Sequence, residues 1–154
     1  MKPVMVVGVG SPFGADRWGW QVIEYLKQRQ SQSAETNSAV QLVYCDRPGL
    51  ALLYLIKDAE LAIVVDAVAG GTAGTVRELN MDQLMVNERQ FSSHDVGVAD
   101  TLRLGDKLNM MPKQFVLYGI ESGPTQLGDR LIDPVLNETG DRIMAHIHGW
   151  LNRH

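Results

Sequence analysis

Short runs of β-branched and other apolar residues alternate along this chain with segments whose apolar residues recur at helical spacing. The runs occupy residues 4–9, 40–45, 61–65 and 115–120. Continuous apolar runs of this length are typical of strands buried on both faces, as in parallel sheets covered by helices. The pattern predicts an α/β fold of three layers, with a twisted, mostly parallel sheet of about five strands and helices on both faces.

Helices are expected between the strands, at residues 17–30, 50–57, about 96–109, and from Asp133 towards the C-terminus. Gly19 lies within the first of these and suggests close packing of that helix. Asp133 is expected to cap the last helix, with Pro134 at its first position. Residues 75–79 fit an edge strand whose Arg77 and Glu78 would discourage pairing with another sheet. The segment 81–90 fits neither pattern.

Composition indicates one domain covering residues 1–154, because the chain is too short for two ordinary domains. Apolar residues make up 45% of the chain and charged residues 21%, as in globular proteins. The net charge is −4 and the basic residues are scattered, so we expect no nucleic-acid partner. No apolar run is long enough to span a membrane, and no cleavable signal begins the chain. We expect a cytoplasmic monomer.

Three side chains that suit a metal or catalytic site follow predicted buried strands or open a predicted helix: Asp16, Asp66 and His94. In an open α/β sheet ligands bind at the carboxyl ends of the parallel strands, so these three are predicted to share one site. Cys45 is the only cysteine, which excludes an internal disulfide and a four-cysteine zinc site. Any metal would therefore have oxygen and nitrogen ligands.

Each candidate also has a structural explanation. Asp16 is placed to cap the first helix, and His94 could be an ordinary loop histidine. Asp66 closes an apolar run, where a carboxylate needs hydrogen bonds, a cation or solvent. Cys45 with His94 could be a nucleophile and its base, although a lone cysteine ending a strand is more often an inert core residue. The remaining histidines, His146, His148 and His154, are interpreted as surface residues.

The turn Gly8-Val9-Gly10 follows a strand, as in dinucleotide-binding folds. The third glycine of that motif would fall at Phe13, so the dinucleotide interpretation is disfavoured. The glycines are explained by a tight turn into the helix. A small-molecule phosphate site at this turn remains an alternative.

Four stretches make the chain similar to the maturation endopeptidases of nickel-iron hydrogenases. These are GVGSPFGAD..G, IVVDAVAGGTAG, SSHDVGVADTLRL and FVLYGIESG, in this order. The resemblance covers nearly the whole chain and implies a twisted sheet between helices. It also implies removal of a C-terminal extension from the hydrogenase large-subunit precursor after nickel insertion.

By position, the resemblance assigns the metal-contacting and catalytic residues to Asp16, Asp66 and His94. It implies that nickel is supplied by the substrate, while zinc or another divalent ion could bind in vitro. No acyl nucleophile is evident, so attack by water is expected.

The first motif departs from the family pattern. The family commonly has Asn where Ser11 stands and then two adjacent acids, whereas here Arg17 follows the single Asp16. The positive charge could weaken cation binding or contact an acidic substrate peptide. Loss of one acid slightly favours the alternative function, a non-catalytic binding protein that inspects or escorts a metal-loaded subunit.

Overall fold

A single mixed sheet organises the part of the chain that the structure describes. The structure is a computed structural model and describes residues 2–10, 17–30, 38–86, 97–123 and 130–154. The strands are β1 (Val4–Gly10), β2 (Val40–Asp46), β3 (Leu61–Val68), β4 (Val76–Leu79) and β5 (Gln114–Glu121). Their order in the sheet is β2-β1-β3-β5-β4. All neighbouring pairs are parallel except β4 and β5, which confirms the predicted mostly parallel sheet with an edge strand.

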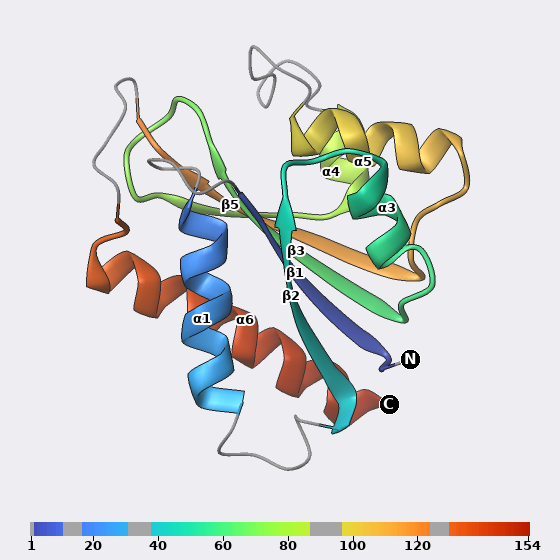
Figure 1. The fold of residues 1–154 in the computed structure, drawn as a ribbon, viewed down its shortest axis with the longest axis horizontal. Helices are drawn as coiled ribbons and strands as arrows, with labels where there is room; N and C mark the ends of the chain where they lie inside the picture. The colour runs from blue at the N-terminus through green and yellow to red at the C-terminus, as the bar shows by residue number, and fades with distance from the viewer. Residues whose placement is uncertain (1, 11–16, 31–37, 87–96, 124–129) are drawn as a thin grey trace.

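Helices cover both faces of this sheet, as predicted (Figure 1). They are α1 (Trp18–Gln30), α3 (Leu50–Ile56), α4 (Met81–Val86), α5 (Val98–Lys107) and α6 (Asp133–Arg153). The helices α1 and α6 lie on one face, and α3, α4 and α5 on the other (Figure 1). The segment 81–90, which the sequence left unassigned, begins with α4. None of the described helices has the length and apolar character needed to cross a membrane.

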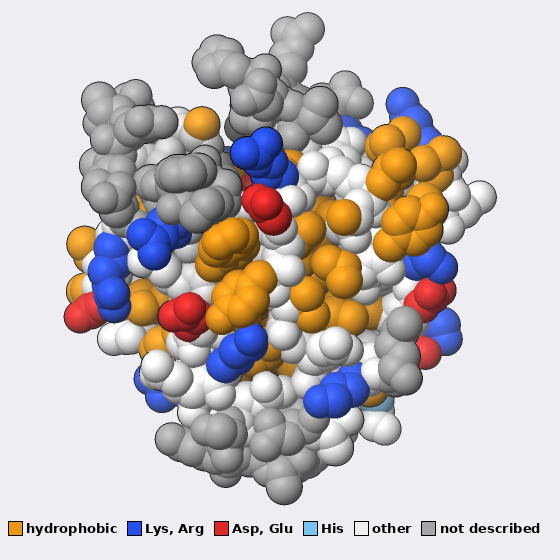
Figure 2. Space-filling view, in the orientation of Figure 1, with side chains coloured by type: hydrophobic (Ala, Val, Ile, Leu, Met, Phe, Trp, Pro, Cys, Tyr) orange, Lys and Arg blue, Asp and Glu red, His pale blue; other side chains and the backbone are white. Residues whose placement is uncertain are grey.

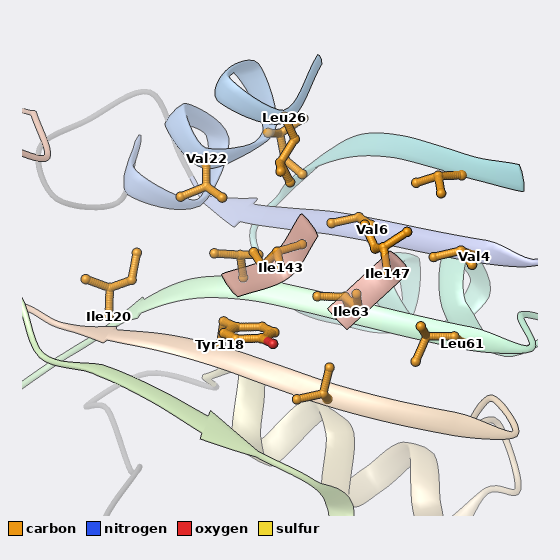
Figure 3. Packing of buried hydrophobic residues seen from close by; sticks show 14 of the residues in the cluster. Val4, Val6, Val22, Leu26, Leu61, Ile63, Tyr118, Ile120, Ile143 and Ile147 are labelled. Carbon is orange, nitrogen blue, oxygen red and sulfur yellow. The ribbon is translucent and has the colours of Figure 1, made fainter. Parts of the chain in front are cut away.

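Alternate residues of the strands supply two separate cores. Val4 and Val6 of β1 face α1 and α6, whereas Met5 and Val7 face α3 and α5. Figure 3 shows the first of these cores, in which Ile143 of α6 lies among side chains from the strands. Because side chains alternate along a strand, burial on both faces requires apolar residues at consecutive positions. The continuous apolar runs in the sequence are explained by this double cover.

The helix α1 approaches the sheet through two glycines. A Cβ atom at Gly19 would lie 2.3 Å from the carbonyl oxygen of Val9 and 2.7 Å from that of Val65. A Cβ atom at Gly8 would lie 2.3 Å from the carbonyl oxygen of Gly19. Real side chains cannot approach backbone this closely, so backbone packs directly on backbone here. The close packing predicted from Gly19 is confirmed.

Among the differences from the boundaries predicted from sequence, two change the place assigned to an aspartate. The strand β3 continues to Val68 instead of ending at Val65, because residues 66–68 still pair with β5. Asp133 is the first residue of α6 and Ile132 occupies the N-cap without a side-chain hydrogen bond, so the predicted capping role of Asp133 is wrong. A carboxylate in the first turn is still favourable, since it interacts with the positive end of the helix dipole.

We predict that Gly19→Ala will destabilise the fold, because the added methyl group must displace the backbone of β1 or β3. Overpacking of this kind typically costs about 1–3 kcal/mol, and thermal or denaturant unfolding measures it. Gly149→Ala in α6 is a matched control, since the nearest atom to its Cβ is Arg153 Nη1 at 3.5 Å. That control should be neutral or stabilising, as alanine is the better helix former. Equal unfolding midpoints for Gly19→Ala and wild type would contradict the packing argument.

Candidate functional site

The chain changes direction across the sheet at β1. The connection through α1 leads from β1 to β2 on one side, and β3 lies on the other side of β1. In α/β sheets, ligands bind outside the carboxyl ends of strands at such a point. Both α1 and α5 begin near the carboxyl ends of the strands and run back along the sheet (Figure 1). The carboxyl ends of β1 and β3 are therefore the place where the fold is expected to hold a functional site.

Asp66 lies at this point. The paired residues of β1 and β3 end at Gly8 and Val65, so Asp66 is the first residue of β3 beyond that ladder. On its other side it still pairs with Gly119 of β5. The buried run of β3 ends here, and the Asp66 side chain is half-buried. The sequence predicts that Asp66 follows the strand. It lies within β3, but beyond the residues that pair with β1, so its carboxylate is only partly removed from solvent.

The strand alternation places Asp66 on the face covered by α3, α4 and α5. Val64 of β3 belongs to the core on that face, and Asp66 follows it by two residues. The start of α5 packs into the same core through Val98 and Ala99. The expected helix at 96–109 is thus confirmed as α5, with its first turn on the same face as Asp66.

Asp16 and His94 lie outside the described residues, as does the predicted capping contact of Asp16. The shared site of Asp16, Asp66 and His94 therefore stays a prediction. Among the residues that the structure does describe, no three His, Cys, Asp or Glu side chains form a group that could hold a metal ion. Asp66 can contribute one carboxylate to a metal site.

A glycine-rich loop follows β3 and is tied to the end of β5. Gly70 and Gly123 exchange backbone hydrogen bonds of 3.2 and 2.9 Å, and the Gly74 N–H donates to the Glu121 carbonyl at 2.8 Å. Gly70 and Gly123 have φ of 87° and 86°, which glycine adopts without strain. These bonds hold the loop beside the carboxyl ends of β3 and β5, a few residues beyond Asp66.

Cys45 lies close enough to Asp66 for their charges to interact, but it is poorly suited to nucleophilic chemistry. Its side chain is buried in the same core as Val64. Burial raises the pKa of the Cys45 thiol, and the carboxylates of Asp46 and Asp66 raise it further. Because the thiolate is the reactive form, these effects lower reactivity. This supports the interpretation of Cys45 as a core residue.

We predict that Cys45 in the folded protein reacts slowly with a disulfide reagent at neutral pH, because the thiol is both buried and protonated. The same reagent should react at the rate of a free thiol once the protein is unfolded in guanidinium, which serves as the internal control. The absorbance of the thiolate that the reagent releases measures the rate of reaction. Fast modification of the folded protein would indicate an activated cysteine and reopen its role as a nucleophile.

A polar cluster on the opposite face corrects the interpretation of His146 as an ordinary surface residue. The buried Tyr118 hydroxyl donates a hydrogen bond to Glu78 Oε1 of the edge strand β4. His146 Nδ1 of α6 lies 3.2 Å from Tyr118 Oη and 3.4 Å from Glu78 Oε1. His148 and His154 are exposed, as predicted. Strand residues alternate between faces, so this cluster lies on the other side of the sheet from Asp66.

Hydrogen bonding and burial shift the pKa values of Glu78 and Tyr118 in this cluster. The bond from Tyr118 and the neighbouring His146 and Arg142 lower the pKa of Glu78 against the opposing effect of burial. Burial, together with the Glu78 carboxylate, raises the pKa of Tyr118. Both shifts favour a charged carboxylate beside a neutral phenol, which is a pairing that stabilises the edge of the sheet.

We predict that Glu78→Gln lowers stability in a pH-dependent way. Because the folded pKa of Glu78 is lowered, its contribution is present above the unfolded pKa of about 4.3 and is lost as pH falls through the folded value. Unfolding midpoints of wild type and variant should therefore differ at pH 7 and converge in acid. Glu60→Gln is the control, since its exposed pair with Lys113 should contribute little. A difference that is constant from pH 7 to pH 3 would contradict the argument.

Comparison with known proteins gives the family of this fold. The family model described as HycI, hydrogenase maturation protease, matches residues 20–148, which is most of the chain. The chain therefore belongs to the hydrogenase maturation protease family. The matched region contains positions 66 and 94, and it begins after Asp16. No curated protein matches the chain by sequence.

Solved structures share the fold. The hydrogenase maturating endopeptidase HybD from Escherichia coli is 21% identical with a TM-score of 0.71, over 97% of this chain and 93% of that protein. The maturation protease HycI from Thermococcus kodakarensis is 22% identical with a TM-score of 0.64, over 95% and 90%. HybD from Thermococcus kodakarensis is 20% identical with a TM-score of 0.62, over 98% and 99%. At these identities the likeness is one of fold.

Proposed function

We propose that this protein is an endopeptidase that removes the C-terminal extension of a nickel-loaded hydrogenase large-subunit precursor. Its membership of the hydrogenase maturation protease family supports the reaction class. The observation that carries the assignment to a site is the position of Asp66. It is a half-buried carboxylate at the change of direction of the sheet, where the ladder between β1 and β3 has ended.

In this proposal the nickel belongs to the substrate and not to the protease. Asp16, Asp66 and His94 complete the coordination of nickel that the precursor already holds, so that only loaded precursor is positioned for cleavage. Carboxylate and imidazole groups suit nickel, and Asp66 offers one such group from a fixed strand. Zinc or another divalent ion could occupy these ligands in vitro without substituting for nickel inside the precursor.

The cleavage itself is assigned to water. Cys45 is disfavoured as a nucleophile by its raised pKa and its burial, and the sequence offers no serine in a nucleophile turn. In this proposal Asp66 orients or deprotonates the attacking water. Its pairing with β5 at the edge of the core supports this role, because it fixes the backbone that carries the carboxylate.

The experiment compares nickel-loaded with nickel-free precursor. We expect wild-type protein to release the C-terminal peptide only from loaded precursor, even when zinc is added, because the nickel inside the substrate is the recognition element. Loss of the peptide mass, followed over time by intact-mass measurement, is the readout. Asp66→Asn and His94→Ala should abolish processing with little change in the unfolding midpoint, whereas Cys45→Ala should remain active.

Different outcomes point to different functions. Equal cleavage of both precursors would eliminate the nickel-reading mechanism. Tight binding of loaded precursor without cleavage by wild type would favour a non-catalytic protein that inspects or escorts the metal-loaded subunit. A folded but inactive Cys45→Ala protein would favour a thiol protease.

A further inference from the structure

A cationic side chain lies on the same face of the sheet as Asp66, separated from it by one glycine. Gly119 of β5 pairs with Asp66 of β3 on one side and with Arg77 of β4 on the other. The three residues therefore form one row across the sheet. Arg77, like Asp66, is half-buried.

The alternation of side chains fixes the face. Leu79 of β4 and its partner Leu117 of β5 belong to the core beneath α3, α4 and α5. Val76 packs against the core beneath α1 and α6. Residues two apart on a strand share a face, so Arg77 lies on the side of Leu79 and of Asp66. Glu78, between them in sequence, is on the other face with Tyr118.

The residue of β5 between Asp66 and Arg77 has no side chain, and the methyl groups of Val68 lie over it. Neighbouring strands lie about 4.8 Å apart, so the Cα atoms of Asp66 and Arg77 are about 10 Å apart. A Cβ atom at Gly119 would have only the methyl groups of Val68, at 3.3 and 3.5 Å, within 4 Å among the described atoms. The arrangement leaves the two charged side chains on either side of a backbone that carries no side chain of its own.

We propose that Arg77 is a further substrate-contacting residue, which binds a negatively charged oxygen of the peptide at the cleavage point. This inference rests on the proposed peptidase function and extends the Asp66 site across β5. Arginine suits the role because its guanidinium is charged at any working pH and offers several donors to one oxygen.

The chemistry explains why a cation is useful beside Asp66. Water adds through its oxygen to the scissile carbonyl carbon, and an electron pair moves to the carbonyl oxygen, which becomes negative. The carbon–nitrogen bond then breaks, and both protons of the water end on the departing amine, leaving a carboxylate on the other fragment. A guanidinium group can stabilise the negative oxygen in the transition state and in the product.

The alternative role for Arg77 is protection of an exposed edge strand, for which a charge of either sign is adequate. Charge reversal distinguishes the two. Arg77→Glu preserves a charged edge, so it should leave activity unchanged if Arg77 only prevents edge pairing. If Arg77 contacts the anionic oxygen, Arg77→Glu should abolish processing.

The test measures kcat and KM for processing of nickel-loaded precursor by wild type, Arg77→Gln, Arg77→Lys and Arg77→Glu. We expect Arg77→Gln to lower kcat/KM about a hundredfold, as for loss of one transition-state donor, and Arg77→Lys to retain part of the activity. Arg142→Gln is the matched control, because it removes a guanidinium that donates to the Val76 carbonyl on the opposite face. That control should keep wild-type kcat and KM. Unfolding midpoints verify that every variant is folded.

A loss in kcat supports the contact to the oxygen that becomes charged during the reaction. A rise in KM alone would overturn it, because it would place the contact at a group already charged in the substrate. Wild-type kinetics in folded Arg77→Gln would overturn it while leaving the proposed function intact. If wild type itself does not cleave, the proposed reaction is wrong. The affinity of each variant for nickel-loaded precursor then tests whether Arg77 contacts the substrate. Weaker, less salt-dependent binding by Arg77→Gln than by Arg142→Gln would support the contact, and equal binding would overturn it.

Discussion

The close approach of α1 to the sheet through Gly8 and Gly19 is the constraint on which the rest of the structure depends. It brings the backbone of the first helix against the carbonyl oxygens of Val9 and Val65, at the end of the ladder between β1 and β3. The helix α1 is thereby fixed at the point where the chain changes direction across the sheet. Asp66 follows Val65 directly, so its position is set by the same contact.

The two faces of the sheet carry different polar chemistry. Beneath α6, Tyr118, Glu78 and His146 form a polar cluster, and the pKa shifts of Glu78 and Tyr118 favour a charged carboxylate beside a neutral phenol. On the other face, Asp66 and Arg77 lie beyond the apolar core on either side of Gly119. The first cluster stabilises the edge of the sheet, whereas the second is the pair to which we assign contact with the substrate.

One face of the molecule carries apolar side chains among charged ones. Figure 2 shows hydrophobic side chains over the part of the molecule around α1, β2 and α3, interspersed with lysine, arginine and acidic residues. Tyr44 and Tyr54 are among the exposed apolar residues, and Lys27 lies over the Tyr44 ring at 4.3 Å.

The sequence by itself determined most of the elements and the layers, because apolar runs and helical spacing are local and strong, and its motifs indicated the family by resemblance. It also marked Asp66, since a carboxylate ending an apolar run is unusual. Only the tertiary structure decided that Arg77, Gly119 and Asp66 form one row and that His146 reaches Tyr118. These pairings depend on the register between strands and helices far apart in the chain, and register is set by the packing of the whole core. The positions of Asp16 and His94 relative to Asp66 lie outside the described residues and stay predictions.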